Sequence, residues 1–395
     1  MASVKRMFFA TVFAAQLAAA AVSGGAAEPA AAATAGTAAA VTVTLNEFQT
    51  AKLVHRPRIE SGTVLLPLRE TGDMLKARTT YFAEDKRIAI VSPAYRVEMR
   101  LGSATATVNG EAYKLASPPK NVNGTVFVPI RFVGEALGVQ VNWIAKEKRV
   151  NLNFEDRYLL AVKGTLAAEL AYWLDRRTGE LFASKKGEAA RLVADTNVKV
   201  SGAGGMSIHL STAADVLTVT DTYGEPGLNT DIYKLVVTDG RLSLETKAHY
   251  WGIHPIRNIE WGANGSLLFV DGRTLYETDN DGAVRAKHDL RALTGFGDEA
   301  FQVEWYDDDA MVVRPHQTGW LTLIDRETGQ ATRLIEKVAS PEQVQTYLEL
   351  SKLVNDAAFQ YWDGLAVVGR EGDTLKLKHT AFQDGGTRLI DYPLE

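Results

Sequence analysis

The pattern of hydrophobic and polar positions divides the chain after residue 154. From Val41 the period is two, because Val41, Val43 and Leu45 alternate with threonine and asparagine, which is typical of a half-buried strand. Behind residue 154, short alternating segments are separated by tight-turn signals, which predicts an all-β domain at 155–395. We therefore expect a mainly β protein in which a different kind of domain, at 41–154, comes first.

The front region contains one stretch twice. GTVLLPLRETGDMLKARTTYFAEDKRIAI begins at Gly62, and GTVFVPIRFVGEALGVQVNWIAKEKRVNL begins at Gly124, and the two align without a gap. An internal duplication is the most economical explanation. One copy offers a few strands and one face of a two-turn helix, which is too little to close a core, so we expect the two copies to pack together.

Each copy predicts a strand, a short helix and a hairpin, and hence an α+β module. In the second copy, 125–129 reads as a strand ended by proline, and 131–137 places its apolar residues on one helical face. Gly138 supplies the left-handed residue that ends a helix. Residues 139–143 alternate, which predicts that Trp143 points inward.

Turn signals recur through the rear region. Each begins with an aspartate that is closely followed by glycine, at Asp175, Asp239, Asp279, Asp325 and Asp384. Three similar triplets, at 259–261, 303–305 and 360–362, each open a segment that runs to one of these turns. The spacing suits blades of about 40 to 50 residues. We predict a degenerate β-propeller of roughly five blades, with a β-sandwich as the alternative.

One helix interrupts the rear pattern. Ser340 can cap it, Pro341 fits its first turn, and Gln343 completes a capping box. We expect a helical insertion near 340–356, between the last two blades.

The N-terminus has the layout of a secretory signal peptide. Lys5 and Arg6 precede a sixteen-residue apolar run, which is followed by small residues up to Ala27. An uncleaved membrane anchor is the alternative, although the run is shorter than the roughly 20 residues that span a bilayer. We predict a signal peptide at 1–27, an alanine-rich linker at 28–40, and a protein that is secreted to the extracellular space or the cell surface.

Composition excludes several classes of function. The chain has 395 residues, 46% of them hydrophobic and 23% charged, so two globular domains are expected. It contains no cysteine, which removes disulfides, thiolate metal sites, thiol nucleophiles and a lipidated cysteine anchor. Loss of the signal peptide takes the net charge from −5 to −7, which disfavours nucleic acid and anionic membranes.

The double GTVFVPIRFVGEALG…VNW pattern resembles the copper amine oxidase N-terminal-like or stalk domain, found at the front of many exported proteins of Gram-positive bacteria. The resemblance covers 41–154. It implies an α+β module that serves attachment or contacts at the cell envelope. In the oxidases, copper and the modified tyrosine belong to a separate catalytic domain, so the resemblance implies no copper chemistry. We expect no cofactor and no metal.

Candidate ligand contacts come from aromatic residues beside histidines and acids. Of seven histidines, only His249 and His254 are close, and they lack the helical spacing of a zinc site. Packing in an aromatic cluster is their ordinary explanation. The specific hypothesis is a ligand-contacting loop at Tyr250, Trp251 and His254.

A second pair of candidates is Trp305 and Asp307, beside an acidic run at 307–309. Both this run and 279–282 could suggest calcium. An EF-hand register from Glu277, however, would put His288 where the bidentate glutamate belongs, so turn residues explain the acids better. No phosphate loop and no Gly-x-Ser-x-Gly elbow occurs, so no catalytic residue is predicted.

Two functions follow from these observations. We favour a non-catalytic, envelope-associated binding or scaffold protein whose partner is a cell-wall polymer or an envelope protein. The alternative is a secreted hydrolase that acts on envelope carbohydrate or phosphoester from the propeller mouth.

Arg69 and Arg131 follow the proline in both copies and could bind an anionic polymer, although their duplication favours a structural role.

Overall fold

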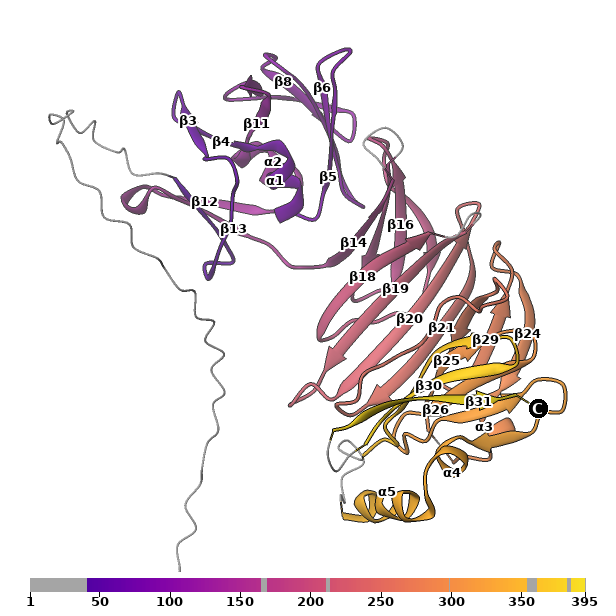
Figure 1. Cartoon of the computed structure of the whole chain (residues 1–395). Helices are drawn as coiled ribbons and strands as arrows, with labels where there is room; N and C mark the ends of the chain where they lie inside the picture. The colour runs from indigo at the N-terminus through magenta and orange to yellow at the C-terminus, as the bar shows by residue number, and fades with distance from the viewer. Residues whose placement is uncertain are drawn as a thin grey trace, which may run out of the picture. The chain divides into compact units, whose positions relative to one another are not determined.

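The computed structural model describes residues 41–164, 169–210, 214–297, 299–353, 361–381 and 385–394. The predicted signal peptide and linker, and the Asp384 turn, lie outside these ranges. Strands dominate the described residues and the helices are few and short (Figure 1), which confirms the prediction of a mainly β protein.

The duplicated stretch, together with the short strand before each copy, gives the same elements twice. The first copy forms β3 (Arg58–Glu60), β4 (Thr63–Pro67), α1 (Leu68–Met74), β5 (Arg78–Phe82) and β6 (Arg87–Val91). The second forms β10 (Lys120–Val122), β11 (Thr125–Pro129), α2 (Ile130–Ala136), β12 (Gln140–Ile144) and β13 (Arg149–Asn153), with a 3-10 turn at Ala145–Glu147. Every pair of boundaries has the same offset in sequence as Gly62 and Gly124, so the duplication in sequence is a duplication of structure.

The two copies pair with each other directly. Strands β4 and β11 are antiparallel neighbours, and Leu66 lies opposite Val128, its own equivalent in the other copy. Each hairpin is then extended differently. The first continues into β7 (Arg96–Arg100), β8 (Thr105–Val108) and β9 (Glu111–Lys114), whereas the second gains β1 (Thr42–Leu45), parallel to β13, and β2 (Gln49–Thr50).

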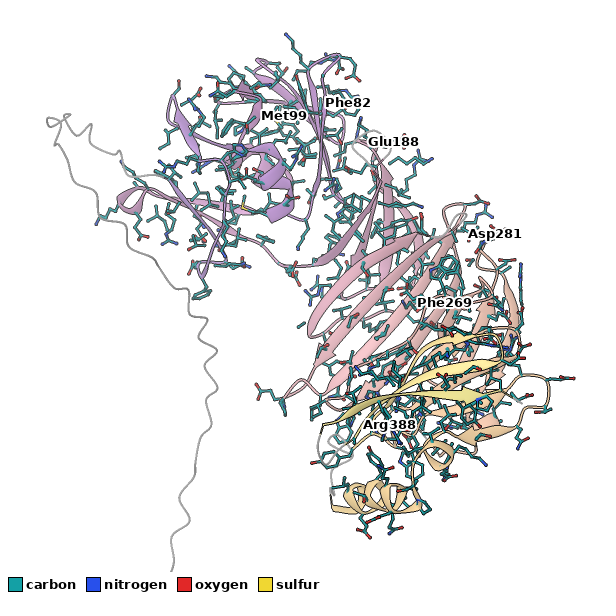
Figure 2. All side chains as sticks on the ribbon, viewed as in Figure 1. Phe82, Met99, Glu188, Phe269, Asp281 and Arg388 are labelled. Carbon is teal, nitrogen blue, oxygen red and sulfur yellow. The ribbon has the colours of Figure 1, made fainter. Side chains whose placement is uncertain are left out.

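The cores of the front region are built by exchange between the copies. In one core, Ile88 and Ile90 of the first hairpin pack with Val126 and Val128 of the second copy; Met99, labelled in Figure 2, belongs to it. The other core has the equivalent composition, with Val150 and Leu152 packed against Val64 and Leu66. Strands β4 and β11 therefore each lie under the hairpin of the other copy, and neither copy closes a core alone.

Trp143 does not point inward as its alternation predicted, because it is 37% exposed. The helix α2 covers only the start of β12: a Cβ on Gly134 would lie 2.4 Å from Val141 Cγ2, so this glycine permits the close approach. Val139 and Val141 are buried there. Trp143 lies farther along an edge strand, beyond this cover.

The described part of the rear region forms five consecutive antiparallel sheets, which we number one to five, and each is a meander of neighbouring strands (Figure 1). Sheet one holds β14 (Tyr158–Lys163), β15 (Leu170–Asp175), β16 (Glu180–Lys185) and β17 (Arg191–Asp195), and sheet two holds β18 (Ala203–Leu210), β19 (Asp215–Tyr223), β20 (Asn229–Thr238) and β21 (Arg241–Trp251). Sheet three holds β22 (Leu267–Val270), β23 (Thr274–Thr278) and β24 (Val284–Asp289). Sheet four holds β25 (Phe301–Tyr306), β26 (Ala310–Pro315), β27 (Thr322–Asp325) and β28 (Ala331–Arg333), and sheet five holds β29 (Leu365–Glu371), β30 (Thr374–Thr380) and β31 (Thr387–Pro393).

The aspartate turns connect strands within these sheets. The Asp175 carboxylate accepts hydrogen bonds from the Arg177 and Thr178 amides, at 2.9 and 3.1 Å, and closes the β15–β16 hairpin. Asp239 and Gly240 take positive φ values of 52° and 74° between β20 and β21. Local turn chemistry therefore sets these connections.

Three helices lie among the described residues of the rear region: α3 (Leu290–Thr294), α4 (Ile335–Val338) and α5 (Pro341–Leu353). Helix α5 comes between sheets four and five in the chain. Its capping box is formed, since Gln343 N donates to Ser340 Oγ at 3.2 Å and Ser340 N donates to Gln343 Oε1 at 3.1 Å. The buried side chain of Tyr347 packs into the core of these two sheets.

Candidate functional site

Tyr250 and Trp251 end a strand rather than form the loop that the sequence suggested. Strand β21 runs through Trp251, and side chains on a strand alternate between its two faces. Tyr250 is 1% exposed, whereas Trp251 lies on the opposite face together with His249. The two aromatic residues therefore do not share one surface.

The face that holds Trp251 gathers polar and aromatic side chains at one end of sheet two. The strand register aligns Tyr223, Asn229 and Trp251 in one row across β19, β20 and β21. The next row on this face contains Asp231 and His249. We call these five residues, with Lys247, the sheet-end surface.

Asp231 organises the sheet-end surface. Its buried carboxylate lies 2.7 Å from His249 Nδ1 and 2.8 Å from Lys247 Nζ. Burial opposes ionisation, but the hydrogen bonds from Lys247 and His249 outweigh it and hold the pKa of Asp231 below its usual value. With Nδ1 used in this way, His249 has Nε2 left for a ligand. The rings of His249 and Tyr223 are 6.4 Å apart.

Tyr250 and His254 belong to a different group, a packed aromatic cluster with His316 and Trp362. The His254 ring stacks on Trp362 at 4.6 Å, and Tyr250 meets His316 edge-on at 5.0 Å. Trp362 Nε1 donates to the His316 carbonyl at 3.0 Å. Burial, with smaller contributions from neighbouring histidines, lowers the pKa of His316 to about 4, so its ring is neutral at pH 7.

A buried arginine supports this aromatic cluster. Arg314 is fully buried, and its guanidinium lies 4.7 Å from the Trp362 ring centroid. It donates to Glu304 Oε1 at 2.6 Å, to Asp363 Oδ1 at 2.9 Å, and to the carbonyls of Gly319 and Leu365. The charge is thus paired on all sides, and the cluster is a structural core.

Trp305, near the end of β25, pairs with Asp307 in the turn after that strand. Trp305 Nε1 donates to Asp307 Oδ2 at 2.6 Å, and Arg370 Nη1 donates to the same atom at 2.9 Å. The other carboxylate oxygen accepts the amides of Asp309 and Ala310. These hydrogen bonds hold a turn together and leave Asp307 little capacity for a ligand.

The five residues proposed from the sequence therefore fall into three groups. Trp251 lies on the sheet-end surface, and Tyr250 and His254 lie in the aromatic cluster. Asp307 lies in the turn after β25, where Trp305, near the end of that strand, is bonded to it. The turn and the aromatic cluster lie at opposite ends of β25, because Tyr250 Oη donates to the carbonyl of Phe301, the first residue of that strand.

Sequence interpretation missed a fourth group, centred on Glu277. Its carboxylate accepts hydrogen bonds from Tyr306 Oη at 2.6 Å and Ser266 Oγ at 2.7 Å. Arg326 Nη2 lies 3.3 Å away, and His288 Nε2 lies 3.2 Å from Tyr306 Oη. Burial raises the pKa of Glu277, but the hydrogen bonds outweigh it and hold the pKa below its usual value.

Among the described residues, no group of three or more histidine, aspartate or glutamate side chains is arranged to hold a metal ion. No helix in the part of the chain that the structure describes has the length and apolar character needed to cross a membrane.

Comparison with known proteins identifies the front region only. Residues 46–152 match the family model of the copper amine oxidase N-terminal domain, as the sequence resemblance suggested. A search of curated proteins gave no match.

The chain has a weak likeness to a number of solved structures. A Mycobacterium tuberculosis puromycin-hydrolyzing peptidase is 12% identical, with 80% of this chain and 45% of the peptidase covered and a TM-score of 0.26. Apo AztD from Citrobacter koseri is 8% identical, with 81% and 86% covered and a TM-score of 0.23. The chain thus spans less than half of the peptidase, and TM-scores this low support no functional argument.

Proposed function

We propose that the protein is a secreted, non-catalytic binding protein of the cell envelope in Gram-positive bacteria. The front region attaches it, and the rear region contacts a ligand, for which a cell-wall polymer is the best candidate. The observation that supports a binding role best is the sheet-end surface, where Trp251 and His249 stand beside the fixed carboxylate of Asp231.

The chemistry of the sheet-end surface suits a carbohydrate ligand. An indole face offers a large, rigid apolar area with little conformational entropy to lose. His249 and Lys247 are oriented by Asp231, so their remaining polar atoms are held in place before a ligand arrives. An envelope protein is the second possible partner and would use the same groups.

We further infer that the five rear sheets are blades of a β-propeller. Each sheet is a meander, which supports this inference. The first strands of neighbouring sheets also contact each other: β14 contacts β18, β22 contacts β25, and β25 contacts β29. Because the chain has no cysteine, one can be placed in β14 and one in β29 without interference. A closed ring predicts that these two cysteines crosslink, whereas an open array predicts that they do not.

Attachment is tested by co-sedimentation of the purified protein with cell-wall fractions over a range of salt concentrations. Arg69 and Arg131 are both exposed, and neither makes a hydrogen bond or ion pair with the residues described. A salt-sensitive attachment through them would weaken in the double Arg69→Gln, Arg131→Gln variant. Failure of the unmodified protein to sediment with wall material under any salt condition would remove the proposal's support.

The hydrolase alternative finds its best candidate in the Glu277 group. Glu277 and Tyr306 are buried, and the carboxylate is already occupied by donors, which favours a structural role. Turnover of a panel of glycosides and phosphoesters, lost in Glu277→Gln, would establish the alternative. A blank panel leaves the binding function as the explanation.

A further inference from the structure

A cavity of about 530 Å³ lies between sheets one and two, away from the sheet-end surface and the aromatic cluster. Strands β14 to β17 and the β20–β21 turn line it. Its size is within the usual range for small-ligand sites, which is roughly 300 to 1,000 Å³. None of the residues proposed as ligand contacts from the sequence lies in it.

The inner part of the cavity is polar, and the carboxylate in it is paired with a lysine. Tyr172, which is buried, donates its hydroxyl to Asp215 Oδ2 at 2.7 Å, and Lys163 forms an ion pair with the other oxygen of the same carboxylate. A ligand therefore meets fixed dipoles rather than an uncompensated charge at this inner surface.

The mouth of the cavity presents charges of both signs. Lys185 and Arg191 supply two cations, and Glu188 (labelled in Figure 2) and Asp239 supply two carboxylates. All four residues are exposed, and within the described residues none of their charged groups forms a hydrogen bond or ion pair. A neutral sugar would leave these charges without partners, and a polyanion would meet the two carboxylates.

One wall of the cavity is an edge strand. Strand β17 pairs with β16 on one side only, so its other edge has backbone N–H and C=O groups available. Leu192 of this strand is 53% exposed and lines the cavity. An extended peptide can pair with such an edge and place a side chain against an exposed leucine.

We propose that this cavity binds a short extended peptide that carries one acidic and one basic side chain. The peptide backbone pairs with β17, an apolar side chain packs on Leu192, and the two charged side chains meet the opposite charges at the mouth. This site is separate from the one in the proposed function, so either can fail without the other.

The test measures binding of the blocked peptide acetyl-Glu-Val-Ala-Val-Lys-amide to the purified full chain by titration calorimetry. Replacement of the peptide's glutamate or lysine by glutamine should weaken binding roughly twofold to fivefold each, as exposed ion pairs do. N-methylation of alternate peptide nitrogens should abolish binding, because the backbone can then no longer pair with a strand edge.

The protein variants identify the groups involved. In Arg191→Gln, the preference for the glutamate peptide over its glutamine form should disappear, whereas Arg285→Gln, an exposed arginine outside the cavity, should retain it. Trp251→Ala should leave peptide affinity unchanged. Equal affinity for charged and neutral peptides, or no binding at millimolar concentration, would overturn the proposal. A concentration-dependent dimer that Leu192→Ser abolishes would also overturn it, because a second copy would then occupy the edge.

Discussion

The front and rear regions build their cores in opposite ways. In the front region, each core combines a hairpin from one copy with a strand from the other copy, which is distant in sequence. In the rear region, each sheet consists of consecutive strands, and the sheets then pack on one another. The front region therefore depends on a single nonlocal exchange, whereas the rear depends on local hairpins joined by packed sheet faces and buried polar contacts.

The two regions are also joined within the compact unit Val41–Glu395. Trp173 of β15 is fully buried and donates Nε1 to the carbonyl of Lys76 at 2.7 Å. Arg78 of β5 forms a bidentate ion pair with Glu169, at 2.8 and 2.6 Å. The stability of each region is therefore measured by probes that report on it separately, such as hydrogen exchange of individual amides.

The largest loss of stability is expected when the buried ion network between sheets four and five loses its arginine. Arg314→Met leaves Glu304 and Asp363 buried without their cation, which should lower the free energy of unfolding by about 3 to 5 kcal/mol. Chemical denaturation measures this loss, and hydrogen exchange should locate it in the rear sheets. Arg333→Met, at an exposed pair, is the control and should change little. Equal stability of the two variants would contradict the structural role of Arg314.

The next largest loss of stability is expected at the packing between the two copies. Leu66 is fully buried, and truncation to alanine should cost about 2 to 5 kcal/mol. Because Leu66 packs under the hairpin of the other copy, exchange should accelerate in β12 and β13, far from it in sequence. Leu181→Ala, equally buried in sheet one, is the matched control and should leave those amides protected. Acceleration limited to the first copy would show that each copy folds by itself.

A pH-dependent effect of intermediate size is expected in the rear region. Burial lowers the pKa of His316 from 6.5 to about 4, so the unfolded chain binds a proton at a pH where the folded protein does not. The contribution of His316 to stability is therefore full above pH 6.5 and should fall by about 1.4 kcal/mol per pH unit between 6.5 and 4. Denaturation at several pH values measures the slope. The slope of stability against pH should flatten in His316→Gln and persist in His249→Gln. An unchanged slope in His316→Gln would show that other groups cause the pH dependence.

The smallest effect on stability is expected at the two equivalent arginines. The duplication suggested a structural role for Arg69 and Arg131, but both are exposed, so their replacement by glutamine should shift stability by less than about 0.5 kcal/mol. Loss of wall co-sedimentation without loss of stability would assign them to attachment. A loss of stability above about 1 kcal/mol would restore the structural interpretation.

The local parts of the fold were predictable from the sequence. The similar stretches at Gly62 and Gly124 give equivalent element boundaries, and the capping box at Ser340 starts a helix at Pro341. The exchange between β4 and β11 was not predictable, because hydrophobic periodicity fixes which face of a strand is buried and not which strand covers it. Trp143 was misplaced for the same reason.

The candidate site was predictable only in part. Trp305 and Asp307 meet because they are only two residues apart, at the end of β25 and in the turn after it. Tyr250 and Trp251 were predicted to share a ligand-contacting loop because they stand together beside His249 and His254, whereas the strand extends to Trp251 and alternation places the two aromatic side chains on opposite faces. Arg314 and His316 lie together at the end of β26, but Trp362 comes from the connection before β29, and no local signal in the sequence joins it to them.

The most direct test of the functional account is a titration of the purified protein with soluble cell-wall glycan fragments. Trp251→Ala should weaken binding about tenfold through loss of the aromatic face. Trp261→Ala, an exposed tryptophan in the same region but outside the sheet-end surface, should bind as the unmodified protein does. Equal binding by both variants, or no binding by the unmodified protein, would contradict the assignment of ligand contact to the sheet-end surface.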